Sequence, residues 1–131
     1  MRAVDGSLTD VLSLDLPCDD SAPSRVRSAI ARLEPLNRIC EDAKLVASEL
    51  VSSAVIQSGP YAGKVIHVNV KSAPDRVLIS VGGFPNRVRP SKDAAAAGWG
   101  ARVVQRLARR WGAERWEGYR FWAELAAGPS G

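Results

Sequence analysis

The sequence predicts a mixed α/β (α+β) fold, a two-layer sandwich in which three helices cover one face of a mostly antiparallel sheet. The expected order is strand, helix, helix, strand, strand, loop, helix, strand, strand, with hairpins in place of regular βαβ alternation. The strands alternate apolar residues with Arg, His and Asn, so one sheet face tolerates solvent. With 131 residues, 46% of them hydrophobic, the chain suits one domain over residues 1–126.

The first half of the chain supplies one strand and two helices. Residues 12–16 alternate apolar and polar side chains before a proline, which indicates an edge strand. Residues 21–36 place apolar side chains at helical spacing. Asp42 opens the strongest helical pattern in the sequence, DAKLVASELVSSAVIQSG, and the pair Gly59-Pro60 ends it.

A hairpin and a long loop follow. Residues 64–72 and 76–82 each alternate apolar and polar side chains, and the turn residues Ala73-Pro74-Asp75 lie between them. Residues 83–97 mix Gly, Pro, Asn and charges without an apolar period. We expect them to form a long loop, of the kind that often serves as a lid in a small domain.

The last third of the chain predicts a helix and a second hairpin. Residues 101–112 form an amphipathic pattern that Gly112 stops. The strands of the closing hairpin are expected over residues 113–116 and 119–126. Residues 127–131 are expected to be a disordered tail.

The charge is strongly polarised along the chain. Residues 1–63 carry six Lys and Arg against nine Asp and Glu, whereas residues 76–110 carry eight against one. Such a basic stretch attracts phosphates, nucleic acid or an acidic protein surface, and a solvated helix face is the alternative explanation. On the last helix the positive charges are Arg102, Arg106, Arg109 and Arg110.

Composition excludes several chemistries. Cys18, Cys40 and a single histidine, His67, cannot supply a four-ligand zinc site of the usual kind, and we predict no metal ligands. The longest uncharged run, residues 50–63, is too short and too broken for a membrane span, and the first residues lack a signal-peptide pattern. We expect a cytoplasmic protein with reduced cysteines. His67 has no obvious Asp partner and is expected to be structural.

Three polar residues on the second helix lead to a family resemblance. Glu49, Ser53 and Gln57 are four residues apart and project from nearly one helix face. With VLISVGG, GWGARVVQRLARRWG and FWAEL, their segment ELVSSAVIQSG resembles the small anti-sigma-factor serine kinases of the GHKL ATPase superfamily. The resemblance implies the Bergerat fold, with an ATP site between helices and sheet. An N box, a G1 box and a lid leading to a G2 box would form that site.

The N box of the family resembles E-L-V-x-N-A-V-x-H-S. By this resemblance Glu49 holds the place of a base near the γ-phosphate, Ser53 stands where an Asn holds Mg²⁺, and Gln57 replaces a His. A Ser hydroxyl reaches less far than an Asn carbonyl and is a weaker ligand for a hard cation.

The G1 and G2 boxes match the family pattern to different degrees. Gly83 falls where the family has the Asp that reads adenine, and a lost charge-assisted hydrogen bond costs about 1.5–3 kcal/mol, or roughly tenfold to more than a hundredfold in affinity. Gly98, Gly100 and Arg102 resemble the G2 box, whose backbone N–H groups cradle phosphates at a helix N-terminus.

These features predict a regulatory protein that acts by protein–protein binding and whose ATP site is degenerate, with Glu49 as a vestigial base. The resemblance implies a sigma factor or a STAS-type antagonist as partner and leaves homodimer formation open. An active ATP-dependent serine kinase, with Ser53 and water in place of Asn, is the alternative. A nucleic-acid-binding protein using residues 76–110 is a third, although helix-turn-helix spacing and an aromatic-basic strand pattern are both missing.

Overall fold

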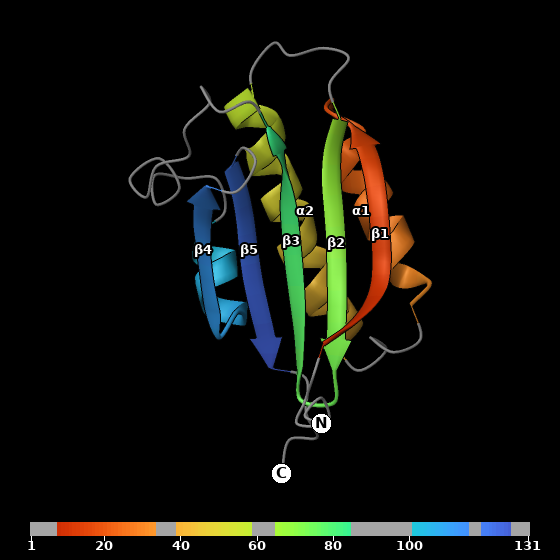
Figure 1. Cartoon of the computed structure of the whole chain (residues 1–131), viewed down its shortest axis with the longest axis vertical. Coiled ribbons are helices and arrows are strands. Elements are labelled where there is room, and N and C mark those ends of the chain that lie inside the picture. Colours follow the sequence, from red (N-terminus) through yellow and green to blue (C-terminus); the bar gives the residue numbers. More distant parts are fainter. Residues whose placement is uncertain (1–7, 34–38, 59–64, 85–100, 116–118, 127–131) are drawn as a thin grey trace.

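The computed structural model describes residues 8–33, 39–58, 65–84, 101–115 and 119–126 (Figure 1). Within these ranges the elements are β1 (Thr9–Pro17), α1 (Ala22–Ala31), α2 (Cys40–Ser58), β2 (Val65–Ala73), β3 (Arg76–Phe84), α4 (Ala101–Leu107), β4 (Arg110–Arg115) and β5 (Tyr119–Ala126). Most of the expected loop 83–97 and the expected tail 127–131 lie outside the described ranges. The fold is therefore mixed α/β, as the sequence predicts.

The five strands form one open antiparallel sheet in the order β1-β2-β3-β5-β4. β2 and β3 make the expected hairpin, with Val70 opposite Ile79 near its middle. β1 lies at one edge of the sheet, which confirms the edge strand, and β4 lies at the other edge. The closing hairpin joins the sheet through its second strand, because β5 pairs with β3.

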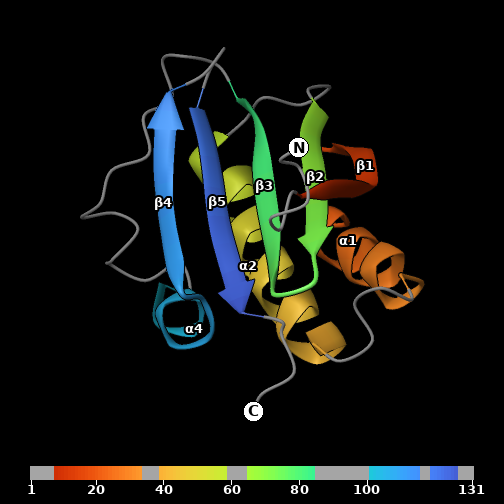
Figure 2. The ribbon, with the colours of Figure 1, turned by 60° about the horizontal axis from the view of Figure 1, so that its bottom comes forward.

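The helices and the apolar sides of the strands enclose the core. In Figure 1 α1, α2 and α4 lie behind the sheet, and the turned view of Figure 2 again shows α2 passing behind β3 and β5. α2 contacts α1, α4, β3 and β5. Its predicted apolar stripe is buried, as are the alternate residues of the central strands, among them Val46, Leu50, Val68, Ile79 and Phe121. The opposite face of the sheet carries the polar side chains.

A small polar network fixes the start of α1. Asp19 Oδ1 accepts hydrogen bonds from the backbone N–H of Ser21 at 2.8 Å and from its hydroxyl at 2.6 Å. The Ser21 hydroxyl also accepts from Arg25 Nε at 2.9 Å. The bonds from Ser21 lower the pKa of Asp19 from its ordinary value. Ser21 thus stands at the N-cap but uses its hydroxyl on Asp19. The expectation that this helix reaches Leu36 is wrong, because α1 ends at Ala31 with Arg32 as its C-cap.

The helix expected over residues 101–112 is wrong in its second half. α4 ends at Leu107, and Arg110–Arg115 form β4, so the strand expected from Ala113 begins three residues earlier. The backbone N–H of Arg109 donates to the carbonyl of Glu124 at 2.7 Å. From this point the backbone pairs with β5 and no longer continues the helix.

Trp111 explains why the sequence predicts the wrong end for this helix. This side chain matches helical spacing with Leu107 and Ala108, and all three do pack against the core. Trp111 reaches the core from a strand, however, where it lies opposite Ala123 of β5. Pairing with the next strand, β5, outweighs the local helical pattern, which is a weak preference by itself.

Candidate functional site

The predicted N-box residues lie on α2. Glu49 is half-buried and Ser53 is fully buried, while the side chain of Gln57 is outside the described set. In Figure 1 the last turns of α2 and the C-terminal end of β3 lie at the same end of the molecule. The fold therefore brings these two segments to one end of the molecule.

Ser53 is the polar residue of α2 whose burial needs an explanation. Its side chain has no exposed area, and its Oγ makes no hydrogen bond within the described ranges. Ser48, on the same helix, instead donates its hydroxyl to the Leu45 carbonyl at 3.0 Å. A buried hydroxyl without a partner costs about 1–3 kcal/mol. Because Mg²⁺ keeps several of its waters, a hydrated ion does not reach so enclosed an oxygen.

The end of β3 offers small residues where the family has a carboxylate. Gly82 lies between His67 of β2 and Arg120 of β5 in the ladder, and Gly83 follows it. The strand RVLISVGGF contains no Asp or Glu. With Ser53 enclosed and this acceptor missing, the residues present do not fit the magnesium nucleotide that the resemblance implies.

Only part of the expected G2 box lies within the described ranges. Gly98 and Gly100 lie outside the described ranges, and Arg102 belongs to α4 without a described side chain. Arg109 and Arg110, expected on the face of that helix, lie beyond its end, and both interact with Glu124. The arginines at 102–110 therefore do not share one helix face, which corrects that expectation.

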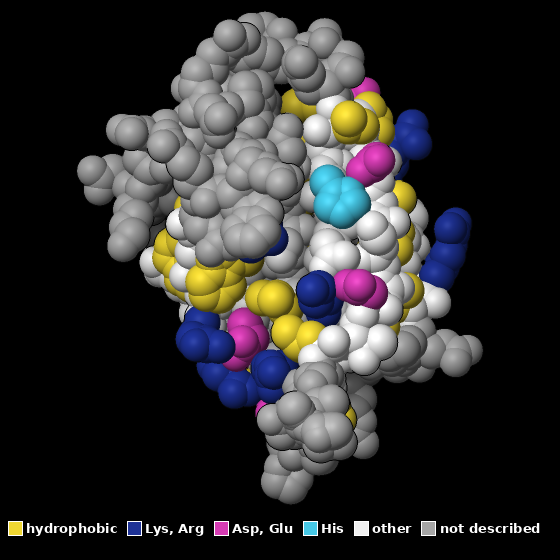
Figure 3. Space-filling model, viewed as in Figure 1, with side chains coloured by type: hydrophobic (Ala, Val, Ile, Leu, Met, Phe, Trp, Pro, Cys, Tyr) yellow, Lys and Arg dark blue, Asp and Glu magenta, His cyan; other side chains and the backbone are white. Residues whose placement is uncertain are grey.

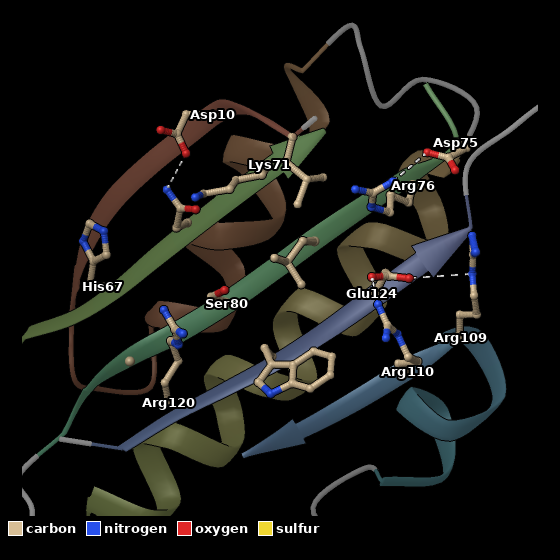
Figure 4. A pocket seen from close by; sticks show the side chains of 15 residues that line it. Asp10, His67, Lys71, Asp75, Arg76, Ser80, Arg109, Arg110, Arg120 and Glu124 are labelled. Carbon is tan, nitrogen blue, oxygen red and sulfur yellow. Dashed lines mark hydrogen bonds and ion pairs between the residues drawn. The ribbon is translucent and has the colours of Figure 1, made fainter. Parts of the chain in front are cut away.

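Strand register brings a second set of residues together on the sheet face away from the helices. The sequence predicts that this face is polar, but it does not show which residues of neighbouring strands lie opposite one another. Side chains of both charges gather on this face around His67, as Figure 3 shows. The register forms three rows across it: Asp15–His67–Gly82–Arg120, Ser13–Asn69–Ser80–Trp122–Gly112 and Asp10–Lys71–Leu78–Glu124–Arg110. A hollow of about 990 Å³ lies over the central part of these rows (Figure 4).

His67 has a carboxylate partner, contrary to expectation. Its Nδ1 lies 2.7 Å from Asp15 Oδ1, and its Nε2 lies 3.4 Å from Ser13 Oγ. The His67 and Asp15 side chains are 52% and 68% exposed, so water weakens their attraction. We assign this cluster to the pairing of edge strand β1 with β2, because an exposed carboxylate does little to activate an imidazole.

Glu124 holds together the corner where α4 gives way to β4. Its side chain is 8% exposed, and Oε1 accepts a hydrogen bond from Arg110 Nη2 at 2.8 Å. Arg109 Nε lies 3.8 Å from Oε2. One largely buried carboxylate therefore faces two guanidinium groups, which leaves this corner of the open face with an excess of positive charge.

No protein-family model matches this chain, and no curated protein matches it. Within the described ranges no helix is both long and apolar enough to cross a membrane. In the same part of the chain, no cluster of three or more His, Cys, Asp and Glu side chains could hold a metal ion.

Proposed function

We propose that this protein is a regulator that acts by binding another protein, built on the frame of the GHKL anti-sigma-factor kinases with an ATP site that is weak or lost. The proposal includes a two-layer sandwich of the Bergerat type. The order of elements, the antiparallel sheet and the central place of α2 beside β3 and α4 support it.

The burial of Ser53 is the observation that supports the proposal most directly. The oxygen at the expected metal position is fully buried and unpaired within the described ranges. The glycines at the end of β3 remove the acceptor that would select adenine. Each lost charge-assisted contact costs about 1.5–3 kcal/mol, so the two together reduce affinity by at least about a hundredfold.

The proposed partner is a protein. By resemblance it is a sigma factor or a STAS-type antagonist, and the setting is transcription regulation in the cytoplasm. A frame that has lost its nucleotide contacts still presents its outer surfaces, which is sufficient for regulation by binding.

An active serine kinase is the second candidate, and Glu49 is the observation that favours it. This carboxylate is half-buried and lies four residues before Ser53 on α2. A general base needs bound substrate within hydrogen-bond reach, so this candidate requires that the chain bind magnesium nucleotide.

Thermal unfolding with Mg·ATP separates the two candidates. A site with a dissociation constant of about 5 μM would gain about 3 kcal/mol at 1 mM nucleotide, which raises the Tm of a domain of this size by about 10 °C. We expect a rise below about 2 °C with Mg·ATP and with Mg·ADP. A rise near 10 °C would favour the kinase, and loss of substrate phosphorylation in Glu49→Ala would then identify the base.

A further inference from the structure

The hollow on the open sheet face is bounded on the β2 side by side chains that turn away from β3. Asn69 Nδ2 donates toward β1, to Asp10 Oδ1 at 3.2 Å and to the Leu12 carbonyl at 3.4 Å. His67 also turns toward β1, where its Nδ1 lies 2.7 Å from Asp15 Oδ1. The space over β3 is therefore left open on this side, and both amide hydrogens of Asn69 are already used.

Side chains on the β5 side of the hollow turn outward as well. The Trp122 ring lies over Gly112 of β4, where an added Cβ would be 3.2 Å from it. Glu124 Oε1 accepts from Arg110 Nη2, also on β4, at 2.8 Å. These contacts all lead away from β3, so the floor of the hollow is formed by β3 itself.

The floor of the hollow combines a small residue with an apolar one. Ser80 and Leu78 alternate on the same side of β3, and both are half-buried. In the register Trp122 lies beside Ser80, and Lys71 lies beside Leu78. The half-buried indole and the leucine thus offer apolar contacts on a face that is otherwise polar.

Two polar groups beside this floor are free to bind a ligand. Within the described ranges Lys71 makes no ion pair, and the Ser80 hydroxyl makes no hydrogen bond. Figure 4 shows Lys71 on β2 and Ser80 on β3 on the same face of the sheet. Carboxylates already engage three other cations that line the hollow, Arg76, Arg109 and Arg110. One unpaired ammonium group beside one hydroxyl suits a single carboxylate.

The spacing of Lys71 and Trp122 limits the size of the ligand. They lie on strands separated by β3 and in neighbouring rows of the register, so about 12 Å separates their backbone positions. Both side chains take up part of that length, and a pair of fused rings bearing one carboxylate fits the remainder. The volume of about 990 Å³ is within the range of small-molecule sites.

We propose that this hollow binds a small aromatic carboxylate. The carboxylate lies at the Lys71 ammonium and accepts a hydrogen bond from the Ser80 hydroxyl, while the ring packs on Leu78 and against Trp122. The hollow is on the sheet face away from the helices, whereas the expected nucleotide site lies between helices and sheet. The inference therefore goes beyond the proposed function and does not depend on it.

Titration of 2-naphthoate into the ¹⁵N-labelled protein, followed by amide chemical shifts, tests the proposal. The matched probe is 2-naphthylmethanol, which keeps the rings and replaces the carboxylate. We expect saturable shifts centred on Ser80 and Leu78, with a dissociation constant of about 1 mM or below, as ordinary ligand efficiency gives for a molecule of this size. The alcohol should bind at least about fivefold more weakly.

Three variants separate the parts of the site. Lys71→Gln should weaken naphthoate binding at least about fivefold and change binding of the alcohol less than twofold. Arg27→Gln removes the same charge from the exposed side of α1 and should change naphthoate binding less than twofold. Ser80→Phe fills the floor and should abolish binding of both probes, while the remaining amide shifts show that the protein is folded.

Other outcomes overturn the proposal. Shifts that do not saturate by about 10 mM, or that centre on another surface, mean that the hollow is not the site. Equal binding of the two probes, or equal losses in Lys71→Gln and Arg27→Gln, would refute the carboxylate contact. Displacement of naphthoate by an equal concentration of inorganic phosphate would assign a general anion site. Tight Mg·ATP binding that leaves naphthoate binding unchanged would refute only the proposed loss of the ATP site.

Discussion

The indole of Trp122 covers Gly112, its partner across the β4–β5 ladder, so closely that a Cβ built on Gly112 would lie 3.2 Å from the ring. The helical pattern predicts that Gly112 ends a helix, but in the structure Gly112 lies in a strand and packs beneath the Trp122 ring. This contact holds the ring of Trp122 against β4.

Gly112→Val should therefore destabilise the protein by about 1–3 kcal/mol, since the added methyl groups must displace the indole. Urea unfolding measures the change. In a Trp122→Ala background the same substitution should cost much less, because the ring that it displaces is gone. Equal losses in the two backgrounds would show that the contact is not the cause. Ala113→Val, at an exposed neighbouring position, should stay within about 0.5 kcal/mol.

Glu124→Gln should lower the free energy of unfolding by about 1–2 kcal/mol. The substitution leaves two guanidinium groups without their carboxylate at the corner between α4 and β4. Glu41→Gln is the matched control, because the Glu41 side chain is 84% exposed in its 2.9 Å pair with Lys44 and should contribute much less. Chemical unfolding that gives the two variants equal stability would contradict the structural role of Glu124.

Asp19 should make the stability of α1 depend on pH in the acid range. Hydrogen bonds from Ser21 lower its pKa below 3.8, so its charged form favours the folded state. That contribution is fully present above pH 3.8 and is lost as the pH falls through the lowered pKa. Asp19→Ala should thus be less stable than the parent at pH 7, and the difference should shrink at pH 2.5.

Thermal unfolding at the two pH values measures this difference, with Asp20→Ala as the control at the exposed neighbouring position. A gap between Asp19→Ala and the parent that widens in acid would contradict the assigned direction of the shift.

Ser53→Ala should stabilise the protein by about 1 kcal/mol. It removes a buried hydroxyl that has no partner in the described ranges, and alanine is the better helix former. Ser48→Ala, which breaks the bond to the Leu45 carbonyl, should give no such gain. Loss of stability in Ser53→Ala, measured by urea unfolding, would mean that the hydroxyl does have a partner.

Much of the fold could be predicted because its signals are local. The apolar stripe of α2 identifies that helix, and alternation identifies β2 and β3. The boundary between α4 and β4 could not be predicted, because Trp111 satisfies both a helical and a strand period. Pairing with Ala123 decides between them, and the sequence pattern predicts the hairpin but not that it extends back to Arg110.

The candidate site could also be predicted from the sequence only in part. Glu49 and Ser53 could be placed on one helix from their spacing, but the burial of Ser53 depends on what packs around α2. His67 and Asp15 could each be assigned to the polar side of a strand. Their 2.7 Å contact depends on the β1–β2 register, which joins residues far apart in sequence. The hollow over the polar face of the sheet likewise depends on strand register.

Calorimetric titration of Mg·ATP into the parent and into Ser53→Asn/Gly83→Asp tests the central claim most directly. The double substitution restores the oxygen ligand and the adenine acceptor that the resemblance calls for. We expect no low-micromolar binding by the parent and at least tenfold tighter binding by the variant. Low-micromolar binding by the unaltered chain would contradict the account.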